Sequence, residues 1–401
     1  MTTAEQMPSF AARMASLDGS GLAAILALSG SSDTVNLSGG FPETTLFPAD
    51  ALSTLCQEVL SNQPEVALQY APLRGLPELR AEVADRLKAD LGRDIDSGEF
   101  MITSGGIEGI ELLARSFLDP GDVVAVEAPT YLGALSGFRT HGASLFEVPI
   151  DDNGLSTDHL AEALKMGLRP KLCYVIADHQ NPSGALMSLE RRRHLVELAA
   201  RYGFYVVDDV AYRELSFDGA TLPSLASLDP SVVIQVGTFS KTFNPGFRLG
   251  WLLASPRLID QFATAKQNTD QCASAFGQLL LSSYISTGLL DETVVRARAH
   301  YGAQAHEMGL ALEAHLGSST TWIRPRGGFF YWVTFNEQVD MRALKSQAEQ
   351  RGVAYVPGEL FYASSRGKGS VRLSFSRVPH ANIEFGIRRL AATVASSDHN
   401  E

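Results

Sequence analysis

The sequence has few cysteines, no long apolar run and no excess of positive charge. Cys56, Cys173 and Cys272 are scattered, odd in number and without the spacing of metal ligands or a disulfide framework, which suits a reducing cytoplasm. No apolar stretch of about 18 residues predicts a transmembrane helix, and the start "MTTAEQMPSF" lacks the features of a signal peptide. With a formal charge of −12 and no cationic block, nucleic acid and anionic membranes are not expected partners.

The remaining composition is that of a globular protein. The 401 residues are 45% hydrophobic and 19% charged, enough for a large core or two domains. Short β-branched runs alternate with helical patterns, one of which covers 189–203 and ends at Gly203, a typical C-terminal cap. This alternation predicts an α/β fold with a largely parallel sheet and helices on both faces. Strands are predicted at 122–129, 143–150, 171–178, 203–210, 231–238 and 249–255.

The last quarter of the sequence has a different pattern. A long helix is predicted over 289–315, followed by the strand "GGFFYWVTF", a helix at 340–352 and the strand "SVRLSFS". These elements predict a smaller α+β domain. The first forty residues, too broken by glycine and proline for the large sheet, are expected to join it. We therefore predict a large domain over 46–295 and a discontinuous small domain formed by 1–45 and 296–401.

Polar residues that follow the predicted strands are candidates for a binding site, because ligands of open parallel sheets bind beyond the carboxyl ends of the strands. Ser104, Gly105 and Gly106 stand between a strand and a helix, where backbone N–H groups can hold a phosphate. Tyr131 follows a strand and a proline, and Asn181 lies in an Asn-Pro-Ser-Gly turn. Each of these features also has a purely structural explanation, as a tight turn or a packed tyrosine.

The strand in "YVVDDVAYREL" ends in two aspartates. Side chains alternate along a strand, so Asp208 and Asp209 cannot both face one pocket. A buried carboxylate needs a partner, so one of them is expected to face a cation, although a helix cap or a solvated pair would also explain the residues. Either aspartate fits, and the three-residue spacing to Tyr212 favours Asp209.

The segment "GTFSKTFNPGFRLGW" (237–251) places Lys241 directly after a strand. A desolvated lysine near another cation has a lowered pKa and attacks carbonyl groups. The hydroxyls of Thr238 and Ser240 and the guanidinium of Arg248 are suitable phosphate ligands. A solvated loop after an edge strand is the alternative interpretation. The combination makes chemical sense if one ligand carries both an aldehyde and a phosphate.

These motifs, in this order, resemble those of the pyridoxal-phosphate-dependent aminotransferases of fold type I (class I/II), and more narrowly the 2-aminoadipate/kynurenine/aromatic aminotransferase group. The resemblance covers nearly the whole chain, from "NLSGGFPETTLFP" and "LQYAPLRGLPELR" to "VAYVPGELFY" and "VRLSFS". It implies a homodimer that moves an amino group between an L-amino acid and a 2-oxo acid. Its cofactor would be pyridoxal 5'-phosphate, held as a Schiff base by Lys241.

The resemblance also implies a role for each residue. Asp209 would bind the protonated pyridine nitrogen of the cofactor, Asn181 and Tyr212 its ring hydroxyl, and Tyr131 would stack on the ring. Tyr70 would reach the phosphate of the partner subunit, and Arg372 would hold the substrate α-carboxylate near Gly40 and Asn181. No metal is implied. The residues around the phosphate would be Ser104, Gly105, Gly106, Ile107, Thr238, Ser240 and Arg248.

The sequence departs from the family pattern in two places. Many relatives carry a glutamine after the phosphate turn, where this chain has Ile107, which can offer only its backbone, and Glu108, which would lie near an anion if it faced inward. The stretch "SGLAAILAL" has no charged residue, so an acidic substrate is less supported. The aromatics of "GGFFYWV" could line an apolar pocket, but aromatics on a strand are more often core.

Two other functions fit part of the pattern. Some transcription regulators carry this fold as an effector-sensing domain behind a basic helix-turn-helix segment, whereas only about forty residues here precede "FPETTLFP". Decarboxylation, elimination or an oxygen-using oxidation would use the same Asp, Lys and Arg set, because a fold does not determine its reaction. Turnover with a 2-oxo acid acceptor separates a transaminase from these.

Overall fold

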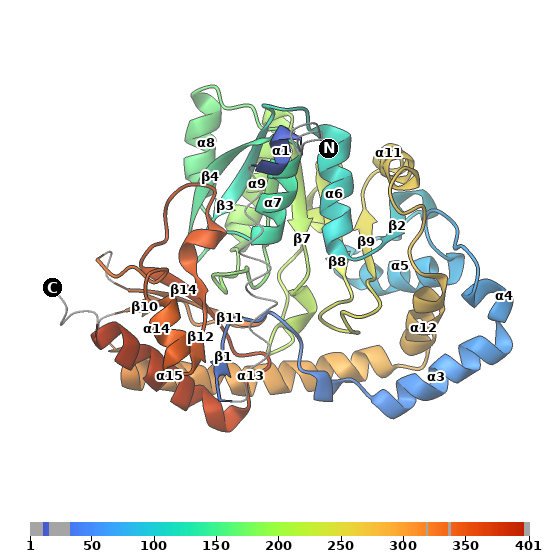
Figure 1. Cartoon of the computed structure of the whole chain (residues 1–401). Helices are drawn as coiled ribbons and strands as arrows, with labels where there is room; N and C mark the ends of the chain where they lie inside the picture. Colours follow the sequence, from blue (N-terminus) through green and yellow to red (C-terminus); the bar gives the residue numbers. More distant parts are fainter. Residues whose placement is uncertain (1–10, 16–32, 318–319, 336–337, 397–401) are drawn as a thin grey trace, which may run out of the picture.

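A mostly parallel sheet of eight strands forms the centre of the larger part of the molecule (Figure 1). The computed structural model describes residues 11–15, 33–317, 320–335 and 338–396. The strand order is β2-β9-β8-β7-β6-β3-β4-β5, in which β4, β3, β6, β7 and β8 are mutually parallel and β9 is antiparallel to both of its neighbours. The predicted α/β fold is confirmed. The strands are β2 (Phe100–Thr103), β3 (Val123–Ala128), β4 (Ser144–Asp151), β5 (Gly154–Leu155), β6 (Leu172–Val175), β7 (Tyr205–Asp209), β8 (Val233–Thr238) and β9 (Gly250–Leu253).

Helices cover both faces of this sheet because its strands are apolar on both sides. In β3, Val124 and Val126 belong to one buried cluster and Ala125 to the other, as strand alternation requires. The first cluster includes α6 (Gly106–Phe117), α7 (Leu132–Thr140) and α11 (Pro256–Gln267). The second includes α5 (Pro77–Leu91), α8 (Thr157–Lys165), α9 (Leu189–Tyr202), α10 (Leu225–Leu228) and α12 (Ala275–Ser286).

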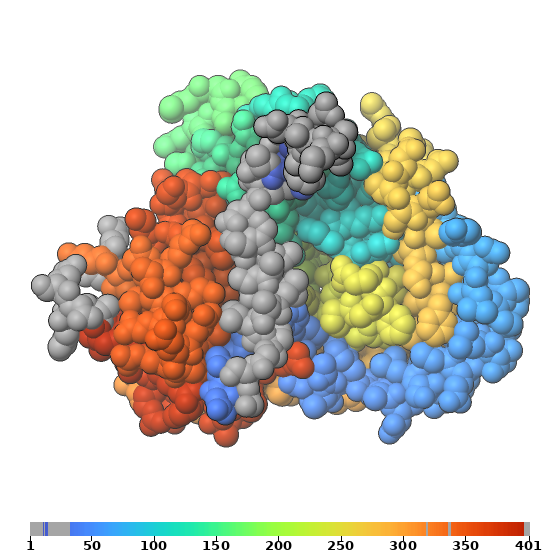
Figure 2. Space-filling model, in the orientation of Figure 1, coloured from blue at the N-terminus to red at the C-terminus, as the bar shows by residue number. Residues whose placement is uncertain are grey.

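A second, antiparallel sheet lies in the C-terminal part, with the order β10-β11-β14-β13. Its strands are β10 (Thr321–Trp322), β11 (Phe330–Thr334), β13 (Val356–Pro357) and β14 (Ser370–Ser374). The long helix α13 (Leu289–His315) runs along the base of the molecule in Figure 1 and packs against α15 (His380–Ala395). Near the N-terminus, β1 (Val35–Asn36) pairs with β12 (Val353–Ala354) of this part. Figure 2 shows the C-terminal segments, in orange and red, gathered on one side of the molecule.

One helix is shorter than expected. The helix predicted at 340–352 is α14, which covers Lys345–Gln350. The Asp340 carboxylate accepts the N–H groups of Arg342 and Ala343, which holds the preceding residues in turns instead of a helix. The remaining elements are α1 (Ala12–Ala15), α3 (Ala49–Asn62), α4 (Pro64–Ala67) and the 3-10 turns η2 (Thr44–Leu46), η3 (Ser97–Glu99), η4 (Arg213–Leu215) and η6 (Gly358–Phe361). In the described part of the chain, no helix has both the length and the apolar character needed to cross a membrane.

Candidate active site

A cavity of about 680 Å³ lies beyond the carboxyl ends of the parallel strands, in the size range of small-molecule sites. Residues from both sheets line it. Its wall also includes apolar side chains, such as Ile110, Leu132 and Phe330. Most of the site residues predicted from the sequence meet here, although they are far apart in the chain: Gly40, Gly106, Ile107, Tyr131, Asn181, Asp209, Tyr212, Thr238, Ser240, Lys241, Arg248 and Arg372.

Three predicted residues do not line this cavity. The Ser104 hydroxyl donates to Asp270, and its backbone N–H donates to Glu108, so both groups face away from the cavity. Gly105 has a φ of +93°, which favours glycine, and lies against Arg248, where a Cβ atom would approach Nη2 to 2.5 Å. Tyr70 is 78% exposed on the surface of the single chain.

Lys241 follows β8 and points into the cavity. Its Nζ donates to the Gly40 carbonyl at 3.0 Å and lies near the rings of Tyr212 and Phe329. Burial, with the nearby Arg372 guanidinium, lowers the pKa of Lys241 to about 8, and Asp209 only partly opposes this. A far larger fraction of this amine is therefore neutral near pH 8 than for an exposed lysine, and a neutral amine is nucleophilic.

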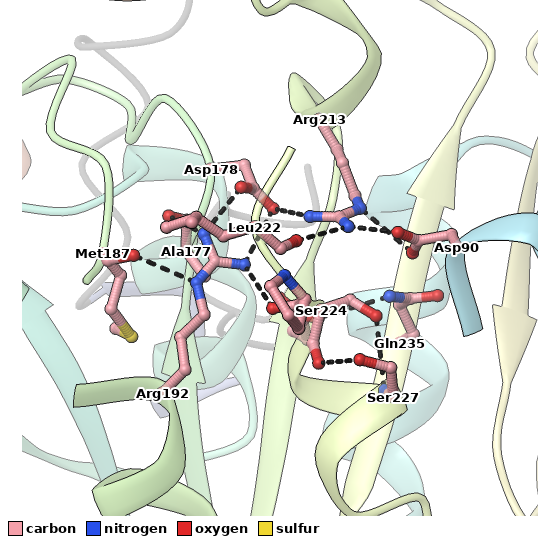
Figure 3. Close-up of polar contacts among 12 residues, drawn as sticks. Asp90, Ala177, Asp178, Met187, Arg192, Arg213, Leu222, Ser224, Ser227 and Gln235 are labelled. Carbon is pink, nitrogen blue, oxygen red and sulfur yellow. Dashed lines mark hydrogen bonds and ion pairs between the residues drawn. The ribbon is translucent and has the colours of Figure 1, made fainter. Parts of the chain in front are cut away.

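The two aspartates at the end of β7 face opposite sides of the sheet. Asp209 shares its side with Val207 and the α6–α7 face, and it lines the cavity, where Tyr174 donates to its Oδ2 at 2.7 Å. Burial raises the pKa of Asp209, so its ionised form needs a cation beside it. Asp208 lies on the other side of the sheet, where Gln235 donates to its Oδ2 at 3.3 Å. Gln235 is labelled in Figure 3.

A group of donors suited to a phosphate lies where β8 ends and α6 begins. Arg248 has a left-handed backbone (φ 53°) and donates to the Ser240 hydroxyl at 3.3 Å. The Thr238 hydroxyl donates to the same oxygen at 3.0 Å. The backbone of Gly106 and Ile107, at the N-terminus of α6, borders the same space. Guanidinium, hydroxyl and amide donors together form an anion site.

Arg372 lines the cavity from the second sheet and is 3% exposed. It is on β14, the strand between β11 and β13, and donates to Asn181 Oδ1 at 3.1 Å and to the Ser38 carbonyl at 2.7 Å. The Phe330 ring lies 4.2 Å from the guanidinium carbon. Burial lowers the pKa of Arg372 to about 10, and its Nε has no hydrogen-bond partner among the described residues. A buried guanidinium with a free donor is suited to a carboxylate.

Two tyrosines also border the cavity. Tyr131 precedes α7, and Gly133 leaves room for its ring, because a Cβ atom there would lie 2.5 Å from Cζ. Tyr212 packs edge-on against the rings of Phe329 and Phe330. Burial raises the pKa of both phenols, so both remain neutral hydrogen-bond donors.

The sequence did not indicate two supporting contacts. Tyr174, on the neighbouring strand β6, donates to Asp209. It pairs with Val207 and so lies on the same face of the sheet as Asp209, which is the sequence pattern that could have predicted the contact. Glu108 does not face the anion site. It binds Lys266 at 2.8 Å, and Lys266 also binds Asp270 at 2.7 Å, so Glu108 has a cationic partner beneath the phosphate turn. Lys266 lies 158 positions away in the sequence, which no local pattern can reveal.

Comparison with known proteins assigns the chain to a family. The family "Aminotransferase class I and II" matches residues 32–390. The aromatic-amino-acid aminotransferase 1 of Thermococcus litoralis is 37% identical over 92% of this chain and 90% of its own. The 2-aminoadipate transaminase of Thermus thermophilus is 35% identical over 89% of both chains. The structure of Pyrococcus horikoshii kynurenine aminotransferase, solved in complex with PMP, has a TM-score of 0.92 and 36% identity over 97% of both chains.

This chain therefore belongs to the class I and II aminotransferases. It is a pyridoxal-phosphate-dependent aminotransferase of fold type I, as the motifs predicted. The cavity fits the cofactor, because one space combines a buried amine of lowered pKa, a buried carboxylate and a cluster of phosphate donors. Gly105, with a φ of +93°, lets Arg248 lie close to the backbone of the phosphate turn.

Proposed function

We propose that this enzyme transfers the amino group of an L-amino acid with an apolar or aromatic side chain to a 2-oxo acid. The observation that carries the proposal is that Lys241, Asp209 and Arg372 line the same cavity. The apolar lining by Phe41, Ile110 and Phe330 favours an apolar side chain. The relatives named for aromatic amino acids and kynurenine support the same substrate class.

Each polar group of the cavity has a proposed task. Pyridoxal phosphate supplies an aldehyde carbon and a ring that withdraws electrons from the substrate Cα. Asp209 would hold the protonated pyridine nitrogen, and Tyr131 would lie against the ring. Tyr212 and the Asn181 amide would donate to the ring hydroxyl. Lys241 would hold the cofactor covalently, and its amine would serve as the base that moves the proton of the substrate Cα.

The phosphate is proposed to bind where β8 meets α6. Arg248 supplies the charge, and Thr238, Ser240 and the N–H groups at Gly106 and Ile107 supply further donors. Gly105 permits the close approach of Arg248. Because both donors of Ser104 are bonded to carboxylates, we propose that Ser104 shapes the turn.

Replacing Arg372 with alanine is expected to lower kcat/KM for amino acids roughly 30- to 5,000-fold, because a desolvated substrate carboxylate loses its bidentate partner. This corresponds to a loss of about 2–5 kcal/mol of transition-state stabilisation. Covalent attachment of the cofactor and turnover of amines without a carboxylate should change far less. Steady-state kinetics and the absorbance of the bound cofactor measure both effects. Arg377→Ala, which alters the next, exposed arginine, is the control. Equal losses on amines and amino acids would refute the carboxylate role of Arg372.

A homodimer is proposed, in which Tyr70 reaches the phosphate of the partner subunit. Its support is a group of exposed apolar side chains on α3 and after α4, where Leu60, Leu68 and Tyr70 are 43%, 77% and 78% exposed. Light scattering should give twice the chain mass of 43.2 kDa.

The Tyr70→Phe variant should bind pyridoxal phosphate about 10- to 100-fold more weakly, since a hydrogen bond to a charged group is lost. Equilibrium titration of the cofactor-free protein measures this change. Tyr202→Phe, on α9, serves as the matched control. A fully active monomer, or a Tyr70→Phe protein of normal affinity, would contradict the shared site.

Two further features belong to the proposal. We propose that residues 46–295 form the large domain and that 1–45 and 296–401 form the small one, which the pairing of β1 with β12 supports for the segment around Val35. Parts of 1–45 lie outside the described residues. A cytoplasmic location is proposed from the scattered free cysteines.

A panel of amino donors tests the function directly. Phenylalanine, tyrosine, leucine and kynurenine, each with 2-oxoglutarate or pyruvate, should be converted, with aspartate poorer as a donor to pyruvate. Formation of the new amino acid is the readout. Release of carbon dioxide or ammonia without amino transfer would favour another reaction on this cofactor. Attachment of the cofactor without any turnover would favour an effector-sensing protein.

A further inference from the structure

Four charged side chains, three of them buried, form a network close to the ends of β6 and β7. Figure 3 shows Asp178 between two arginines and Arg213 between two aspartates. Arg213 Nη1 lies 2.7 Å from Asp178 Oδ2, and Arg192 Nη2 lies 2.6 Å from Asp178 Oδ1. Arg213 also binds Asp90 through Nε at 3.0 Å. We call these four residues the Asp178 network.

The network is anchored to the fold at both ends. Arg192, on α9, is fully buried and donates to the carbonyls of Ala177 and Met187, both at 3.0 Å. Arg213 donates to the Leu222 carbonyl at 2.8 Å and, through Asp90, is tied to α5. The network holds two positive and two negative charges, so its members compensate each other after burial.

Its members stand next to the proposed cofactor residues in the sequence. Asp178 is three residues before Asn181, and Arg213 directly follows Tyr212. The ion pair between Asp178 and Arg213 therefore crosses from the segment after β6 to the segment after β7, which carry the two proposed donors to the ring hydroxyl. We propose that Arg213, through its pair with Asp178, is a positioning residue that sets the distance between Asn181 and Tyr212. This inference rests on the roles proposed above for those two residues.

The geometry requires an arginine. Arg213 uses all three guanidinium nitrogens, toward Asp178, Asp90 and the Leu222 carbonyl. A lysine has one nitrogen and cannot span both carboxylates in this planar arrangement, although it keeps the charge. Arg213→Lys should therefore loosen the connection between the two segments while a positive charge stays near Asp178.

The first experiment compares Arg213→Lys with Arg191→Lys. In the control, the substitution disrupts the ion pair between Arg191 of α9 and Asp151, whose atoms lie 2.6 Å apart. This pair touches neither of the two segments. Cofactor-free protein is titrated with pyridoxal phosphate, and circular dichroism checks the fold. Arg213→Lys should weaken binding on the order of tenfold and shift the pH at which the absorbance of the bound cofactor changes. Arg191→Lys should alter neither. Unchanged affinity and absorbance in Arg213→Lys would overturn the proposal.

The second experiment repeats Arg213→Lys in an Asn181→Ala/Tyr212→Phe background. A positioning residue acts through its targets, so the substitution should add less than about twofold there. The same tenfold loss in both backgrounds would show a general structural effect. It would overturn the positioning role of Arg213 but leave the proposed roles of Asn181 and Tyr212 in place. A double variant with normal cofactor affinity would instead refute the proposed roles of Asn181 and Tyr212, and with them this inference.

A milder variant covers the case in which Arg213→Lys does not fold. The Asp90 side chain is 20% exposed, and Asp90→Asn leaves the pair between Asp178 and Arg213 in place. It should weaken cofactor binding about threefold in the native background and have no effect in the double-variant background. Equal effects in both backgrounds would count against positioning.

Discussion

Lys241→Ala protein should bind pyridoxal phosphate without a covalent bond and lose amino transfer by about 10²–10⁴-fold or more, the range attributed to a positioned proton-transfer group. Burial and Arg372 lower the pKa of Lys241 to about 8, so the native amine is suited both to bond an aldehyde and to accept a proton near neutral pH. Alanine offers neither function. The phosphate donors around Arg248 remain, so reversible binding of the cofactor should persist.

Borohydride reduction followed by peptide mass spectrometry measures the attachment. In the native protein the reduced cofactor should be found on the peptide that contains Lys241, and in Lys241→Ala on none. Lys266 is the internal comparison, because it is also shielded from solvent but its Nζ is bonded to Glu108 and Asp270. Those carboxylates occupy the Lys266 Nζ, so it is not free to attack a carbonyl group. Cofactor reduced onto Lys266 would show that Lys241 has been wrongly assigned.

Asp209→Asn should leave the fold intact and lower kcat by roughly 10²–10³-fold, the scale for loss of one preorganised electrostatic contact. A neutral amide cannot hold a proton on the pyridine nitrogen, so the ring withdraws electrons less strongly. Asparagine matches the size of aspartate. Its Oδ1 can still accept from the Ala211 N–H, while its Nδ2 can donate to the Tyr174 hydroxyl. Steady-state kinetics and thermal unfolding separate the loss of chemistry from a loss of stability.

Asp208→Asn is the matched control, one residue away on the other face of β7. Asp208 is equally buried, and burial with the nearby Asp178 raises its pKa to about 7. A neutral side chain is thus already tolerated there, so kcat should fall by less than about tenfold. If Asp208→Asn inactivates the enzyme and Asp209→Asn does not, the roles of the two aspartates are reversed.

The sequence alone determined most of the large sheet. Buried strands such as 231–238 and 171–178 are short β-branched runs between helical patterns, and these are local properties of the chain. Gly203 ends α9 in the left-handed conformation that its position predicted. Lys241 was also identified locally, because its strand, hydroxyls and arginine lie within a single segment.

Only the tertiary structure decided which side chains face the cavity. Alternation shows that Asp208 and Asp209 point to opposite faces, but which face meets the cavity depends on how the helices cover the sheet. Among the aromatics of 329–332, Phe330 lines the cavity, whereas the Tyr331 hydroxyl binds the Ala305 carbonyl in the core. Arg372 meets Asn181 across 191 positions. Such contacts are set by strand order and register, which bring together residues that no local pattern connects.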